Sequence, residues 1–171
     1  MNYIYILSQI FGTIALVILI LSFQKNKKDE LLKLQVFSSL FFSLQYVFLN
    51  AITGCLMNLM TLVRNIIFRK FQNIKWLIVV IALMIILSAV SYSGLISLLP
   101  TIAVILYSIA IWQKNLTITR IVEVISCSLF IIYNIKFYAI TGLISTIIEL
   151  ISALVAIYRF DIRKKNKVVK Q

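Results

Sequence analysis

Histidine is absent from this chain of 171 residues, and only two cysteines and one proline occur in it. Metal centres of transition ions are usually built from several His and Cys ligands, so we expect no metal site. The same shortage leaves too few groups for general acid–base chemistry, and the sequence has no phosphate-binding glycine loop. We therefore expect that the protein is not an enzyme and has no cofactor.

Acidic residues are also scarce, since five Asp and Glu stand against seventeen Lys and Arg, a net charge of +12. An excess of this size is found in proteins that bind nucleic acids. Here, however, the basic residues fall in short segments between long apolar runs, a pattern that reflects membrane topology. We expect contact with the lipid bilayer and no nucleic-acid partner.

Apolar residues make up 62% of the chain, well above the share of roughly one half in soluble domains. They form runs of about 18–20 residues, the length that a helix needs to cross about 30 Å of hydrocarbon. Membrane-spanning strands would alternate in character, and these runs do not. The sequence predicts an all-α integral membrane protein with seven transmembrane helices, near residues 3–23, 31–50, 51–68, 76–92, 96–112, 119–137 and 139–158.

The distribution of basic residues predicts the orientation. With seven helices, fifteen of the seventeen Lys and Arg residues fall on one side of the membrane, and Lys136 alone falls on the other. Arg64 lies within the third helix. Because basic loops stay in the cytoplasm, we expect a plasma (inner) membrane protein with its N-terminus outside and its C-terminus in the cytoplasm. The sequence is compatible with an oligomer.

An internal repeat relates the two halves of the chain at a distance of 88 residues. Residues 51–54 read Ala-Ile-Thr-Gly, and residues 139–142 repeat them. Three helices per copy is an odd number, so a linker helix must cross the membrane for both copies to have the same orientation. The expected fold is two parallel three-helix bundles joined by a linker (3+1+3), a repeat type known in transporters. The corresponding segments are residues 1–72, 73–94 and 95–160, with a basic tail at 161–171.

Both copies carry a stripe of small and polar residues on their third helix. In the first copy it is spaced i, i+4, i+7, i+11, which is one face of a helix. Because the stripe returns in the same register, we expect both helices to face a shared polar pathway. The alternative is interhelical hydrogen bonding alone. The candidate substrate-binding or pathway residues are Asn58, Thr61, Asn65, Thr146 and Glu149, with Tyr46 and Asn134 from equivalent positions of the second and sixth helices.

Two charged residues lie deep in the predicted membrane. Glu149 is roughly 15 Å along its helix, where a carboxylate costs several kcal/mol unless it is paired, hydrated or protonated. It either binds a proton or substrate, or it is a structural partner of a nearby polar group. Arg64 either forms a charge pair with Glu149 or extends to the inner headgroups. Arg120 and Glu123 are expected to form a surface pair of small energetic worth.

Several blocks resemble known membrane families. They are Leu98-Leu99-Pro100, the basic helix end that contains Arg64, and Tyr133-Asn134 before the glycine of the seventh helix. With the 3+1+3 layout, they are similar to the SWEET/PQ-loop superfamily and, more closely, to the bacterial inner-membrane family called YgjV.

The resemblance to SWEET-like proteins implies alternating access around a central site, lined by asparagines of the third helix of each bundle. Asn58 occupies this position in the first bundle, and Thr146 occupies it in the second. Hinges are implied in the first helix of each bundle, where Pro100 and Gly12 stand. Pro100 is also expected to leave one helix carbonyl without a partner.

Two functions follow from these observations. The first is a small transporter that moves a small polar solute, such as a sugar or a similar metabolite, between the two bundles. The alternative is a non-transporting scaffold, sensor or lipid-interacting protein on the same fold. A carboxylate at mid-membrane favours the transporter, because a scaffold has no need of one.

Overall fold

The long apolar runs form helices because a backbone in hydrocarbon must satisfy its own N–H and C=O groups. The computed structural model describes residues 3–23, 28–71, 73–113 and 115–162. Within these ranges it has seven α-helices: α1 (Tyr3–Phe23), α2 (Lys28–Phe48), α3 (Ile52–Lys70), α4 (Ile74–Val90), α5 (Leu98–Trp112), α6 (Leu116–Lys136) and α7 (Ile140–Ala156). A short 3-10 helix, η1 (Leu95–Ser97), precedes α5, and a π-helix, η2 (Ile157–Ile162), continues α7. The seven helices expected from the sequence are confirmed.

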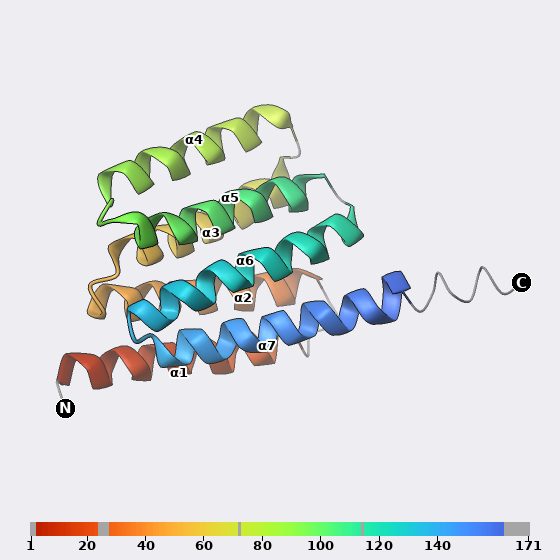
Figure 1. The fold of residues 1–171 in the computed structure, drawn as a ribbon. Coiled ribbons are helices and arrows are strands. Elements are labelled where there is room, and N and C mark those ends of the chain that lie inside the picture. Colours follow the sequence, from red (N-terminus) through yellow and green to blue (C-terminus); the bar gives the residue numbers. More distant parts are fainter. Residues whose placement is uncertain (1–2, 24–27, 72, 114, 163–171) are drawn as a thin grey trace, which may run out of the picture.

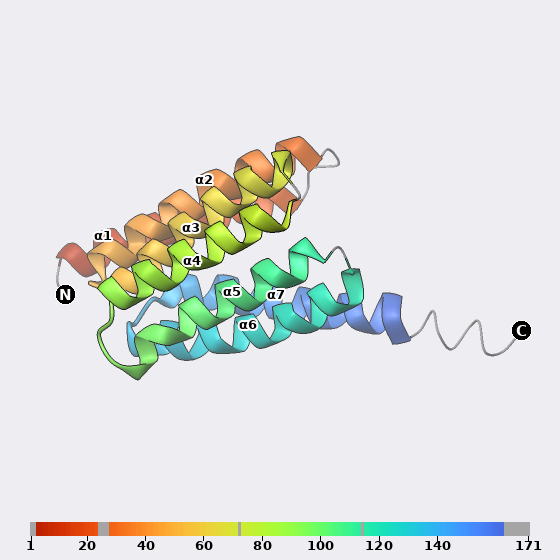
Figure 2. The same ribbon diagram turned by 90° about the horizontal axis from the view of Figure 1, so that it is seen from above.

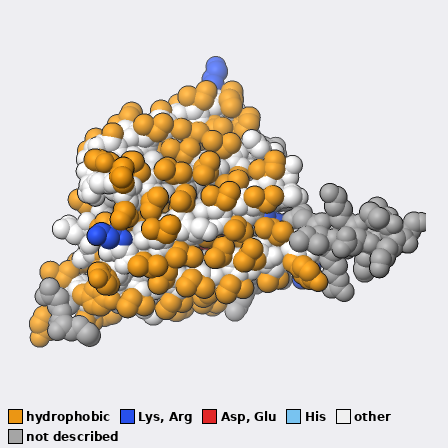
Figure 3. Space-filling view, viewed as in Figure 1, with side chains coloured by type: hydrophobic (Ala, Val, Ile, Leu, Met, Phe, Trp, Pro, Cys, Tyr) orange, Lys and Arg blue, Asp and Glu red, His pale blue; other side chains and the backbone are white. Residues whose placement is uncertain are grey.

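Among the described residues, four helices are long and apolar enough to cross a membrane: Tyr3–Leu21, Leu95–Trp112, Thr117–Lys136 and Ile140–Arg159. Ile52–Phe68 and Ile74–Val90 are shorter apolar helices. Hydrophobic side chains cover most of the face seen in Figure 3, with few basic groups among them. This is the surface of a protein whose solvent is lipid. That all seven helices span the membrane completely stays a prediction. The basic tail also stays a prediction, and residues 163–171 of it lie outside the described residues.

The helices run up and down and form two layers (Figures 1 and 2). One layer contains α1, α2 and α3 in that order, and the other contains α7, α6 and α5. The layers meet where α1 packs against α7 and where α3 packs against α5, while α4 packs against both α3 and α5 at one edge. Because the two layers touch along these two edges, α2 and α6 lie opposite each other between the edges (Figure 1).

Two loops at one end of the molecule have the same backbone conformation. Asn50, between α2 and α3, has φ of 58°, and Tyr138, between α6 and α7, has φ of 52°. In both loops the next residue closes the turn. The Ala51 N–H donates to the Tyr46 carbonyl at 2.9 Å, and the Ala139 N–H donates to an equivalent carbonyl at 3.0 Å. We call this end of the molecule the Asn50 end, and it also carries η1. We call the opposite end, where the loop joins α3 to α4, the Asn73 end.

The same repetition occurs inside the layers. The Ser38 hydroxyl of α2 donates a 2.8 Å hydrogen bond to the backbone carbonyl of Ala15 in α1. The Ser126 hydroxyl of α6 donates a 3.0 Å hydrogen bond to the carbonyl of Ala103 in α5. Both donors and both acceptors are 88 residues apart. Each pair therefore fixes the first helix of its layer against the second with one and the same contact.

Candidate functional site

A cavity of about 670 Å³ lies between the two layers, with walls from α1, α2, α3, α5, α6 and α7. Tyr46 and Gly142 bound it toward the Asn50 end. Toward the Asn73 end the lining reaches Phe68 and Trp112, in the last turns of α3 and α5. The cavity therefore extends from the last turn of α2 and the first turn of α7 to the helix ends at the Asn73 end.

Most of the residues that the sequence singled out lie on this cavity. They are Asn58, Thr61 and Asn65 from α3, Thr146 and Glu149 from α7, and Tyr46 from α2. Asn134 does not line the cavity but contacts two residues that do. The stripes of the two third helices thus face one space, and whether they bind a solute stays a prediction.

Hydrogen bonds to the preceding helical turn hold the polar side chains of the two stripes. The Asn58 amide donates to the Gly54 carbonyl at 3.0 Å, and the Thr146 hydroxyl donates to the Gly142 carbonyl at 2.8 Å. These two bonds are equivalent in the repeat. They satisfy one donor of each side chain within its own helix, and both side chains also line the cavity.

Aromatic and amide side chains close the cavity at the Asn50 end. The Tyr46 hydroxyl donates to Asn134 Oδ1 at 2.5 Å, and Asn134 Nδ2 donates to the Thr146 hydroxyl at 3.2 Å. The Tyr133 hydroxyl accepts the N–H of Gly54 at 2.8 Å, which is one of the free donors in the first turn of α3. The Tyr46 and Tyr133 rings meet edge to face, with centroids 5.8 Å apart. This cluster joins α2 and α3 to α6 and α7.

A second set of hydrogen bonds joins the layers nearby. Gln45 Nε2 donates to the Thr141 hydroxyl at 2.6 Å, and the Thr141 N–H donates to Gln9 Oε1 at 3.3 Å. Gly12 packs at this junction, because a Cβ there would overlap Thr141 and Gln45. Gly12, predicted as a hinge, is thus a point of close helix contact, and its role in bending stays a prediction.

The helix geometry around Pro100 differs from our expectation. Pro100 is buried in the first turn of α5, where the backbone N–H has no helical partner in any case. The Ile96 carbonyl, four residues before Pro100, accepts the Leu98 N–H, which also donates to the Leu95 carbonyl. Pro100 therefore removes no hydrogen bond from α5. Any hinge at this position must come from the junction between η1 and α5.

Arg64 adopts neither of the two expected arrangements. Its side chain is 2% exposed and lines the cavity, so it does not extend to the headgroups. Its Nη2 and Nε donate to Asn65 Oδ1 at 2.9 and 3.2 Å, its Nη1 donates to the Ser108 hydroxyl at 3.2 Å, and the guanidinium lies 5.3 Å from the Tyr107 ring centroid. Within the described part of the chain, Arg64 forms no ion pair with Glu149. The close packing of α3 against α5 gives the guanidinium neutral partners instead.

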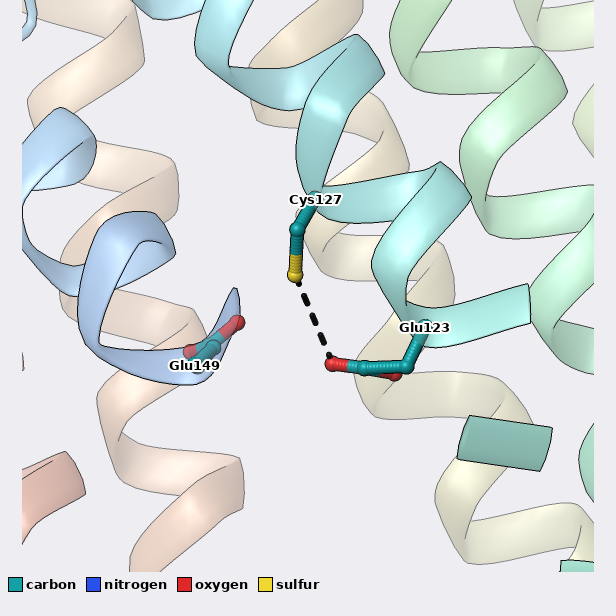
Figure 4. A group of neighbouring side chains, drawn as sticks. All are labelled: Glu123, Cys127 and Glu149. Atoms are coloured by element: carbon teal, nitrogen blue, oxygen red, sulfur yellow. Dashed lines mark hydrogen bonds between the residues drawn. The ribbon is translucent and has the colours of Figure 1, made fainter. Parts of the chain in front are cut away.

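The sequence reasoning placed Glu123 at the protein surface, whereas the structure places it in the cavity wall. Its Oε1 accepts a weak 3.8 Å contact from the Cys127 thiol, while its Oε2 is buried and has no hydrogen-bond partner among the described residues. Figure 4 shows both side chains on α6 directed toward Glu149 on α7. The ligand atoms of the three lie within 4.8 Å of one another, a set that could hold a cation.

A sequence signal for Glu123 existed. Glu123, Cys127, Phe130 and Asn134 have the spacing i, i+4, i+7, i+11, the same as the polar stripe of α3. The first three line the cavity. The signal is weak because apolar residues interrupt it and because Arg120, at i−3, offers an obvious surface partner.

The chain was compared with known protein families, curated proteins and solved structures. The profile of the Imp-YgjV family, described as a bacterial inner membrane protein family, matches residues 6–164. No curated protein and no solved structure matches the chain. The family match covers nearly the whole length, and the long apolar helices agree with it. The chain belongs to the Imp-YgjV family and is a multi-pass protein of the bacterial inner membrane.

Proposed function

We propose that the protein is a small transporter, which moves a small polar solute by alternating access between α1–α3 and α5–α7. The observation that carries this proposal is the shape of the cavity. It is lined by polar groups from both layers, reaches the Asn73 end, and is closed at the Asn50 end by hydrogen bonds that join the layers. A site that is open to one side and gated toward the other is what a carrier needs.

The nature of the closure supports the proposal. Its polar part consists of a few side-chain hydrogen bonds and one aromatic contact, set in a buried apolar cluster that includes Tyr46 and Tyr133. Hydrogen bonds between membrane helices are worth about 0.6 kcal/mol each. A handful of such bonds can be exchanged for others at the opposite end without a large net cost, as a two-state carrier requires.

The finer architecture is part of the same proposal. We take residues 1–72 and 95–160 as two parallel three-helix repeats and residues 73–94 as a linker span, the SWEET-like 3+1+3 arrangement. The equivalent loops, the equivalent Ser38 and Ser126 contacts and the edge position of α4 support it. With the N-terminus outside, the Asn73 end lies in the cytoplasm and the cavity faces inward.

The test needs no knowledge of the solute. In a Cys55→Ala, Cys127→Ser background, a single cysteine at Thr61, inside the cavity, is labelled with a membrane-impermeant maleimide in intact cells and in inverted vesicles. Alternating access predicts labelling from both sides. The matched controls are Tyr92→Cys at the Asn50 end and Asn73→Cys at the other, both exposed, which should each react from one side only.

Labelling of the Thr61→Cys protein from the cytoplasmic side alone would contradict the proposal. It would favour a non-transporting scaffold, sensor or lipid-interacting protein, in which the cavity is static.

A further inference from the structure

Buried charges of both signs share the cavity, and Arg64 and Glu123 attract each other across it, but among the described residues Arg64 forms no ion pair with either carboxylate. Arg64 enters from α3, Glu123 from α6 and Glu149 from α7. The guanidinium hydrogen-bonds only to Asn65 and Ser108 among the described residues. The two carboxylates instead lie beside each other, with Cys127 between them (Figure 4).

This arrangement is unfavourable for the empty protein. Removing a charge from water costs several kcal/mol, and a buried partner of opposite sign normally offsets that cost. Two carboxyl groups within 4.8 Å of each other repel when both are ionised. A protein under selection for stability alone would bring the guanidinium and a carboxylate together. Charged side chains that share one cavity without forming an ion pair are therefore available to bind the opposite charges of a ligand.

We propose that the cavity binds a small zwitterion, whose anionic group contacts Arg64 and whose ammonium group contacts Glu149 and Glu123. This inference rests on the proposed function, because it assigns the substrate class of the same cavity. The simplest ligand of this kind is an amino acid with a free amino and a free carboxyl group.

The hydrogen-bonding capacity of the residues fits such a ligand. A guanidinium has five N–H donors, and the contacts of Arg64 to Asn65 and Ser108 account for three. The donors that are left suit a carboxylate, which guanidinium groups bind with well-matched geometry. An ammonium offers three donors, and the buried Glu123 Oε2 has no partner among the described residues.

A metal ion in the Glu123–Cys127–Glu149 cluster is the competing occupant. It would satisfy the carboxylates but would leave the free N–H donors of Arg64 without an anionic acceptor, and it would add positive charge near a buried cation. A zwitterion supplies both missing charges at once and adds no net charge to the membrane interior. The geometry therefore favours the zwitterion.

The first experiment uses the purified wild-type protein in detergent. Each of the twenty standard L-amino acids is tested by thermal shift, and any that stabilises the protein is titrated by calorimetry. Its N-acetyl derivative, which lacks the ammonium, and its amide, which lacks the carboxylate, are titrated in parallel with glucose and with Zn²⁺ alone. We expect one or more amino acids to bind saturably. Each blocked derivative should bind at least about tenfold more weakly, because a charged hydrogen-bonded contact is worth that much or more.

The second experiment assigns the two ends. Glu149→Gln should remove the discrimination against the N-acetyl derivative and keep the discrimination against the amide. Arg64→Gln should do the reverse. Ser128→Ala, at an exposed residue of α6 outside the cavity lining, is the control and should change neither ratio. A variant that merely lost structure would bind the amino acid and both blocked derivatives more weakly together. It would not lose the discrimination against only one of the two derivatives.

Three outcomes would overturn the inference: no amino acid binds, the blocked derivatives bind as well as the parent, or only glucose or only Zn²⁺ binds. The labelling test of alternating access is independent of these results. Two-sided labelling without zwitterion binding would leave a transporter of another substrate class. Zwitterion binding with one-sided labelling would leave a binding protein that does not transport.

Discussion

The hydroxyl of Tyr46 donates a 2.5 Å hydrogen bond to Oδ1 of Asn134, and these two residues occupy equivalent positions of the repeat, 88 residues apart. In the proposed parallel repeat an approximate twofold axis exchanges the two halves, and residues that it exchanges can touch only if they lie close to it. The proposed axis would therefore pass beside the Tyr46–Asn134 contact, on the Asn50 side of the cavity. The two halves are bonded at this point by a tyrosine on one side and an amide on the other.

Tyr46→Phe removes this hydrogen bond and keeps the ring contact with Tyr133. We expect a small loss in the free energy of unfolding, about 0.6–1.7 kcal/mol, the range for hydrogen bonds between membrane helices. If the contact closes the cavity, labelling of the Thr61→Cys protein from the outer side should also become faster. Tyr138→Phe, at an exposed tyrosine of the same end, is the control and should change neither the melting temperature nor the labelling rate.

Gly54 and Gly142 are equivalent residues with different surroundings, so alanine should affect them differently. A Cβ at Gly54 would lie 2.7 Å from Tyr133 Cε1, a buried ring that cannot easily move, whereas a Cβ at Gly142 would meet Asn134 Oδ1 at 3.2 Å. We expect Gly54→Ala to destabilise the protein by about 1–3 kcal/mol, as overpacking does. Gly142→Ala should cost less. Thermal melting of both variants measures the difference, and equal melting temperatures would refute the explanation.

The orientation can be read with reporter fusions. Fusions after Lys75 and at the C-terminus should be active with a cytoplasmic reporter, and a fusion at Gly94 should be active with a periplasmic one. The reason is the concentration of Lys and Arg in the segments of one side. A cytoplasmic Gly94 would rule out the seven-span topology and the parallel repeat together.

Glu149→Gln tests function against structure at the cavity. The amide has the same shape as the carboxyl group and removes only the charge, so we expect the melting temperature to stay within a few degrees of wild type while solute binding or transport changes. Asn58→Ala should weaken solute binding, because it removes a hydrogen-bonding group from the cavity wall. A Glu149 with a purely structural role would give the opposite result, a lower melting temperature and an unchanged solute response. Lys75→Gln, at an exposed residue of α4 outside the cavity lining, is the charge-removing control.

Local chemistry accounts for what the sequence predicted well. The helix bounds could be read within three residues, because a backbone in hydrocarbon forms helices wherever an apolar run is long enough. The polar stripe of α3 could also be assigned to one face from its spacing alone. Its equivalent on α7 followed from the repeat, and both stripes do lie on one cavity.

The partners of the charged residues could not be predicted in this way. Arg64 has a long side chain with several rotamers, and only the packing of α3 against α5 places Ser108 and Tyr107 within its reach. Glu123 has a basic neighbour one turn away in sequence, and only the packing of α6 beside α7 turns it toward Glu149.

The sequence by itself therefore determined the membrane class, the helices and which faces are polar, because each of these depends on residues within about one or two turns of one another. Only the tertiary structure decided which end of the cavity is closed and which charges share it. Those features depend on side chains from different helices, such as Tyr46 with Asn134 and Glu123 with Glu149. The distances between these side chains are set by how the helices pack, and residue spacing along the chain does not determine helix packing.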